Sequence, residues 1–223
     1  MEARDVDEET PLHLAIRRAV AAPDIPGHLI AIRGANINAQ NIDGKTPLHI
    51  AVGEGTPQVA RDLINLGADI DLADNDGRTP LHEAVVLGWE ETARLLIARH
   101  IAGINVNALN KHGETPLQSA AGIFFDKGAL EIMRMLVSKG ADVKVLDDDK
   151  STLLHRLCGS RWYVEHLEAA QMLVRHGLDI NAQDDSGDTC LHAAASYRDV
   201  NMMRTLLGLG ADAHIANSDG RYP

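Results

Sequence analysis

The chain has 223 residues, 45% of them hydrophobic, and its 21 basic and 32 acidic side chains give a net charge of −11. This composition is typical of a folded globular chain. The negative field disfavours nucleic acid and anionic membranes and favours a partner with a basic patch. No apolar run approaches the length of a membrane span, so we expect no membrane insertion.

The N-terminal residues and the cysteines indicate the cell compartment. The first nine residues are acidic and contain no apolar core, so we expect no signal peptide. The two cysteines, Cys158 and Cys190, are too few for a disulfide framework. We therefore expect an intracellular, cytoplasmic protein, with the nucleus left open.

One motif recurs along the chain. Its fullest form is Thr-Pro-Leu-His-x-Ala, at residues 79–84, and full or partial copies begin at Thr10, Thr46, Thr115, Thr152 and Thr189. The spacings between these threonines are 36, 33, 36, 37 and 37 residues, a period that marks a repeat architecture. We number the expected repeats one to six, at residues 8–37, 44–70, 77–107, 113–143, 150–180 and 187–213, with the start of a seventh at 219–223.

Each repeat reads as two short helices and a turn. In repeat three, Thr79 is a good N-cap, Pro80 suits the first helical position, and Gly88 ends the first helix. A second helix is expected at about residues 90–98, followed by a polar, glycine-rich turn. Neither helix is long enough to be stable alone. The pairs must therefore bury their apolar faces by stacking, which predicts a solenoid.

The repeated motif, the Leu-Leu pair of the second helix and the Gly-Ala-Asp turn resemble the ankyrin repeat, from Thr10 to Pro223. The resemblance implies an all-α solenoid of stacked helix-turn-helix units with hairpin fingers. It also implies a concave groove, formed by the inner helices and fingers, that binds a protein partner. We predict a single array that acts as a non-enzymatic protein–protein interaction module without a cofactor. The alternative is a targeting module, or an unusual active-site scaffold, of an enzyme or effector.

The aromatic residues concentrate in the turns between the two helices of a repeat. Three of these turns are lengthened, at residues 17–23, 122–127 and 159–164. Six of the seven aromatic residues lie in inter-helix turns, whether lengthened or not: Trp89, Phe124, Phe125, Trp162, Tyr163 and Tyr197. They form either an exposed partner-binding edge or a locally buried cluster. This edge is also where the alternative enzymatic site would lie.

The fingers and inner helices provide a second candidate surface. We expect Glu83, Ser119 and Arg156 to project into the groove beside the finger tips. In repeat five the acidic tip, Asp148 and Asp149, could recruit a basic peptide, although such aspartates also cap their own turns. Lys150 replaces the usual glycine there, so we expect a distorted or mobile finger.

The pattern of the histidines indicates a structural role rather than a catalytic or metal-binding one. Five of the eleven occupy the same motif position, where we expect each to bond to the backbone of a neighbouring turn: His13, His49, His82, His155 and His192. The other histidines show no metal-ligand spacing, and no catalytic motif is recognisable. We predict no metal site and no catalytic residue.

Two further expectations concern modification and the C-terminal end. The ankyrin family includes substrates of asparaginyl hydroxylases, and the resemblance implies Asn181 as an acceptor, with Asn38 and Asn107 at equivalent positions. The seventh repeat begins without a recognisable cap, so we expect further repeats or self-association at that end.

Overall fold

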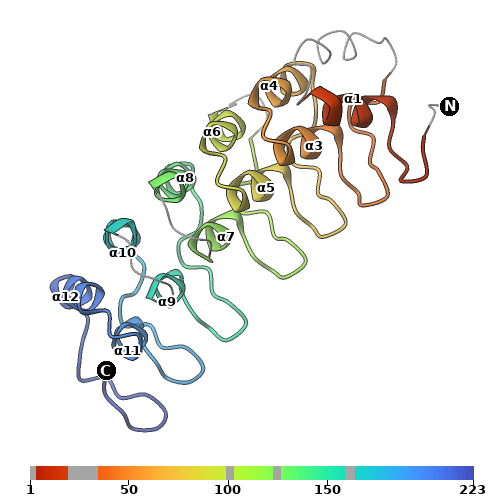
Figure 1. The fold of residues 1–223 in the computed structure, drawn as a ribbon. Coiled ribbons are helices and arrows are strands. Elements are labelled where there is room, and N and C mark those ends of the chain that lie inside the picture. The colour runs from red at the N-terminus through yellow and green to blue at the C-terminus, as the bar shows by residue number, and fades with distance from the viewer. Residues whose placement is uncertain (1–3, 20–34, 99–102, 123–126, 159–163) are drawn as a thin grey trace. The chain divides into compact units, whose positions relative to one another are not determined.

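The computed structural model describes residues 4–19, 35–98, 103–122, 127–158 and 164–223 (Figure 1). Within these ranges it contains eleven α-helices and no strand, apart from two isolated bridges. The predicted all-helical architecture is therefore confirmed for the described part of the chain. The chain divides into two compact units, Met1–Pro116 and Leu117–Pro223.

The first unit has two rows of helices. The inner row is α1 (Pro11–Ala19), α3 (Pro47–Gly53) and α5 (Pro80–Val86), and neighbours in this row pack on each other. The second row is α4 (Pro57–Asn65) and α6 (Glu90–Ala98), which pack together and on their inner partners α3 and α5. This arrangement is the stacked pair of helices that the repeat predicts (Figure 1).

The second unit repeats this arrangement. Its helices are α7 (Pro116–Gly122), α8 (Lys127–Ser138), α9 (Leu153–Cys158), α10 (Val164–Arg175), α11 (Cys190–Ser196) and α12 (Val200–Gly208). Helix α9 packs on α11 in the inner row, while α10 lies between α8 and α12 in the second row. The longest helices of the described chain, α8 and α10, have 12 residues. None of the helices described combines the length and apolar character needed to cross a bilayer.

The start and end of an inner helix follow from its sequence. Thr46 is extended and its hydroxyl accepts the N–H of His49, while Pro47 takes the first helical position, where a missing N–H costs nothing. The helix ends at Gly53, and the residue after its C-cap, Gly55, is left-handed at φ +65°. Such short helices are stabilised mainly by burial. Fully buried side chains line both units, including Leu48, Leu63, Leu81, Leu96, Ile132, Met133, Leu136 and Leu154.

The fingers are hairpin turns that precede each inner helix and project to one side of it (Figure 1). We define them by their five turn residues: 41–45, 74–78 and 110–114 in the first unit, and 147–151, 184–188 and 217–221 in the second. Neighbouring fingers within a unit are joined by one backbone hydrogen bond. Asn75 N–H donates to Asp43 O at 2.9 Å, and Asp185 N–H donates to Asp149 O at 2.9 Å. Within a unit, these hydrogen bonds therefore fix each finger relative to its neighbour.

Candidate functional site

The finger turn is built around an Asp or Asn side chain at its first position. In the finger at 74–78, Asp74 Oδ1 accepts the N–H groups of Asp76 and Arg78, both at 2.9 Å. Gly77 N–H donates to Asp74 O at 2.9 Å, with Gly77 at φ +72°. The side chain thus satisfies the turn backbone, as expected for these turn formers. The first residues of four other fingers accept the same pair of N–H groups: Asn41, Asn110, Asp184 and Asn217.

Each motif histidine joins its inner helix to the next finger. Thr46 N–H donates to His49 Nδ1 at 3.2 Å, and His49 Nε2 lies 2.9 Å from Arg78 O. Because Nδ1 accepts, the proton is on Nε2, and the ring is the neutral tautomer. Burial lowers the pKa of His49 below its ordinary value. The structural role predicted for these histidines is confirmed, since the equivalent bonds recur at His13, His82, His155 and His192.

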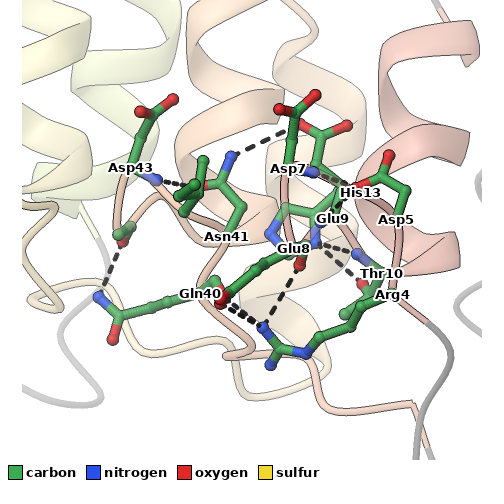
Figure 2. Close-up of polar contacts among 12 residues, drawn as sticks. Arg4, Asp5, Asp7, Glu8, Glu9, Thr10, His13, Gln40, Asn41 and Asp43 are labelled. Atoms are coloured by element: carbon green, nitrogen blue, oxygen red, sulfur yellow. Dashed lines mark hydrogen bonds and ion pairs between the residues drawn. The ribbon is translucent and has the colours of Figure 1, made fainter.

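The N-terminal segment forms an additional finger, which the repeat motif does not predict (Figure 2). Asp5 Oδ1 accepts the N–H groups of Asp7 and Glu9, at 3.0 and 2.8 Å, and Glu8 takes the left-handed position at φ +57°. Arg4 donates to Gln40 O at 2.8 Å. The spacing from Asp5 to Thr10 equals that from Asn41 to Thr46, so the signal was present, but Glu8 replaces the expected glycine.

The finger at 147–151 uses its first side chain differently from the others. Asp147 accepts from Arg156 Nε at 2.6 Å and from Arg156 Nη2 at 2.8 Å, a two-pronged ion pair that is about four-fifths buried. Gln118 Nε2 donates to the same carboxylate at 2.7 Å, and Arg156 Nη1 donates to Gln118 O at 3.1 Å. Asp149 takes over part of the turn, because its Oδ1 accepts Ser151 N–H at 3.0 Å.

The prediction that this finger is distorted is wrong. Lys150 adopts the left-handed conformation, at φ +60°, and its N–H donates to Asp147 O at 2.9 Å, as Gly77 does to Asp74. An ion pair at 2.6 Å joins its side chain to Asp185 of the next finger. The turn therefore keeps the glycine geometry with a lysine. Asp148 and Asp149 are both exposed at its tip.

The inner-helix side chains expected in the groove do not all project. Glu83 is mostly buried and pairs with Lys45 of the preceding repeat at 3.3 Å. Ser119 is buried, so its predicted projection is wrong: it lies in the packed part of the inner row. Arg156 is held by Asp147, as described above, and reaches the surface only as a member of that ion pair.

The inter-helix turns present two exposed aromatic residues. Trp89 is 42% exposed, and its six-membered ring packs against Gly55 of the preceding turn, where an added Cβ would lie 3.0 Å from the ring. Tyr197, at the end of α11, is 55% exposed. These two side chains are therefore exposed rather than buried in a local cluster, and their role in partner binding stays a prediction. The other four lie outside the described residues: Phe124, Phe125, Trp162 and Tyr163.

The remaining reactive side chains of the described residues form no recognisable reaction centre. Cys158 and Cys190 are both buried, and the neighbouring Cys190 thiol together with burial raises the pKa of Cys158 well above its ordinary value. A thiol with a raised pKa is a poor nucleophile at neutral pH. Among the described residues, no group of three His, Cys, Asp or Glu side chains could hold a metal ion.

Asn181 has a structural partner. Its side-chain oxygen accepts Asp212 N–H at 2.9 Å, and its own N–H donates to Asp179 Oδ1 at 2.9 Å. The side chain is partly exposed in the turn after α10. Asn38 makes the same bond to Asp69 N–H in the first unit, at 2.9 Å.

Comparisons with known proteins agree with this architecture. A family model for ankyrin repeats (3 copies) matches residues 12–110, 63–145 and 122–217, which together span most of the chain. A comparison with curated proteins gives no match.

Among solved structures, the ankyrin repeat domain of Bcl-3, described as a unique member of the IkappaB protein family, is similar with a TM-score of 0.79. The two sequences are 28% identical, and the similarity covers 97% of this chain and 93% of that domain. Ankyrin repeats are generally protein–protein interaction modules. The motif, the stacked helix pairs and the family match lead to one conclusion: this chain belongs to the ankyrin repeat family.

Proposed function

We propose that this chain binds a protein partner through the surface of its inner helices and fingers, and that the inter-helix turns form a second contact. The partner segment that meets the fingers carries basic side chains. The observation that carries the proposal is the combination of a fixed finger backbone with exposed side chains at the finger tips.

The fixed backbone supports binding because little order has to be gained when a partner arrives. Each finger is closed by its own backbone bonds and joined to its neighbour, as Asn75 is to Asp43. The tips nevertheless expose both apolar and acidic groups, including Ile42 and Asp43 in the first unit and Asp148 in the second.

The charge of the tips supports a basic partner. The lysines at the tips are already paired within the chain, Lys111 with Asp76 and Lys150 with Asp185. Asp148 and Asp149 remain as additional negative charge, and the Ser151 N–H holds the pKa of Asp149 below its ordinary value, so it stays ionised at neutral pH. A basic segment would gain on-rate and orientation from this field.

The edge made by the inter-helix turns is proposed as the second contact because it exposes large apolar groups. Trp89 and Tyr197 are of the residue types that most often dominate binding energy. Val86 and Leu87, next to Trp89, are also exposed and extend the patch in the first unit. Phe124, Phe125, Trp162 and Tyr163 are assigned to this edge on sequence alone.

The proposal is tested by capturing a partner from the source cells, identifying it by mass spectrometry and measuring its affinity for purified variants. Asp148→Asn with Asp149→Asn should weaken binding and flatten its salt dependence. Trp89→Ala with Tyr197→Ala tests the edge. A matched control, Gln58→Lys with Ser138→Lys, changes the net charge by the same amount on the outer helices and should leave affinity nearly unchanged. Equal affinities for the control and both surface variants would refute the proposal.

A further inference from the structure

The turn between α11 and α12 holds an arginine in a backbone conformation that favours glycine. Arg198 has φ +56°, and its N–H donates to Ala195 O at 2.9 Å. Gly55 and Gly88 occupy the same place in repeats two and three, at φ +65° and +68°, with the equivalent N–H bonds to Val52 and Val85. A side chain at this position costs conformational energy that glycine avoids.

Three non-glycine residues of the described chain have a positive φ, and two of them gain an ion pair. Glu8 pairs with Arg4, and Lys150 pairs with Asp185 of the next finger. Arg198 is exposed and has no ion pair or side-chain hydrogen bond with any residue that the structure describes. The adjacent Asp199 does not pair with Arg198, because the Asp199 carboxylate is buried and caps α12 by accepting Met202 N–H at 2.9 Å.

The residues next to Arg198 in the sequence include two exposed apolar or aromatic side chains. Tyr197 precedes it at 55% exposure, and Val200, the first residue of α12, is 53% exposed. A guanidinium whose neighbours in the sequence are an exposed aromatic and an exposed aliphatic residue matches a carboxylate that is flanked by apolar side chains. The planar fork of the guanidinium gives two parallel hydrogen bonds to a carboxylate, which adds direction to the charge attraction.

We infer that Tyr197, Arg198 and Val200 form an anchor for an acidic segment of a protein partner, in which Arg198 binds an Asp or Glu carboxylate and Tyr197 and Val200 contact an adjacent apolar side chain. This anchor rests on the proposed function only in giving the inter-helix turns a contact role. It differs from the fingers in the sign of the charge that it recognises.

The anchor makes fold stability and binding respond in opposite directions. Arg198→Gly relieves the left-handed backbone and should raise the melting temperature, while it removes the carboxylate contact. Arg198→Gln keeps the backbone cost and also removes the contact, so a loss of binding in both variants cannot come from unfolding. Arg204→Gln removes one positive charge from an exposed position on α12 and is the matched control.

The test uses three blocked tripeptides with phenylalanine at the centre, flanked by glutamates, glutamines or lysines, titrated against the full chain by NMR. The glutamate peptide should shift the Arg198 Nε–H and Tyr197 ring signals. Its affinity should fall about tenfold in Arg198→Gly and Arg198→Gln and be unchanged in Arg204→Gln. Inorganic phosphate is titrated in parallel.

Several results would overturn the anchor: equal binding of the glutamate and lysine peptides, unaltered binding in both Arg198 variants, or a response to phosphate alone. These results are separable from the fate of the proposed function. If the captured partner distinguishes the finger variants while the peptide ignores Arg198, the anchor alone fails. If the peptide binds at Arg198 while the finger variant keeps full partner affinity, the proposed finger contact alone fails.

Discussion

Asp147 and Arg156 lie on different elements of the second unit and are joined by two hydrogen bonds, at 2.6 and 2.8 Å. In the finger at 184–188, the residue equivalent to Asp147 is Asp184, which serves its own turn by accepting the N–H groups of Ser186 and Asp188. Asp147 instead bonds to Arg156 on α9. Because Gln118 contacts both members of this ion pair, the finger at 147–151 is also connected to α7.

Removing the carboxylate should therefore cost more than removing an ordinary turn residue. Asp147→Ala removes the carboxylate from a mostly buried guanidinium, and we expect a loss of about 1–3 kcal/mol in the free energy of unfolding. Urea titration of Asp147→Ala, Arg156→Ala and the double variant measures the coupling. The expected coupling is about 1 kcal/mol or more, whereas additive single effects would mean that the ion pair contributes nothing.

Protonation of the motif histidines should destabilise the first unit as the pH falls. Burial lowers the pKa of His13, His49 and His82 in the folded state, below the ordinary value of 6.5. The unfolded chain therefore takes up these protons first, and stability that is present above 6.5 is lost progressively below it. We expect the urea midpoint, followed by Trp89 fluorescence in a Trp162→Phe background, to fall between about pH 7.5 and about pH 5.5.

His49→Gln provides the control for this pH dependence. Gln118 already occupies the motif position in α7, so the exchange has a precedent in the chain. The variant has lower stability at neutral pH but a shallower pH slope. A slope that is identical in the variant would contradict the assignment to His49.

Substitutions at Gly55 and Gly88 distinguish the cost of backbone strain from the cost of a side-chain contact. Both have positive φ, but an added Cβ would meet the Trp89 ring at Gly55 and nothing within 4 Å at Gly88. Gly55→Ala and Gly88→Ala should each cost roughly 1–3 kcal/mol through the backbone. Only Gly55→Ala should also move the ring and shift Trp89 emission to longer wavelength. An equal emission change in both variants would show that Trp89 does not pack on Gly55.

Lys150 and Lys111 form a matched pair of finger lysines. Each pairs with an aspartate of a neighbouring finger, Asp185 and Asp76 respectively, but only Lys150 has a positive φ. Lys150→Gly removes the ion pair and relieves the backbone, so its melting temperature should exceed that of Lys111→Gly, which only loses interactions. The reverse order would mean that the exposed ion pair outweighs the backbone cost at Lys150.

The sequence was sufficient for the parts of the fold that depend on local chemistry. The stretch around Thr79 predicts the helix start, the glycine end and the histidine bond, because each depends on residue type at a fixed spacing. The fate of Asp147 was not predictable in this way. It has the same residue type as Asp74, and its different use depends on the Arg156 and Gln118 side chains that folding brings to it.

Backbone conformation also could not be predicted from residue type alone. A lysine in a glycine position suggested distortion at Lys150, yet the finger keeps its hydrogen bonds, because neighbouring bonds determine the turn more strongly than one residue's preference. Arg198 shows the same replacement in the inter-helix turn, where Gly55 and Gly88 stand in repeats two and three. For Trp89 and Tyr197, residue type alone could not separate exposure from burial, because large aromatics occupy both environments.

The most direct test of the central claim is amide hydrogen exchange of the full chain with and without its captured partner. We predict that the partner slows exchange in the fingers, such as residues 74–78 and 147–151, and in the inter-helix turns at 86–89 and 196–199. The outer helices α4, α6 and α12 should exchange at unchanged rates. Slowed exchange confined to those outer helices, with the fingers and turns unaffected, would contradict the claim that the fingers and turns bind the partner.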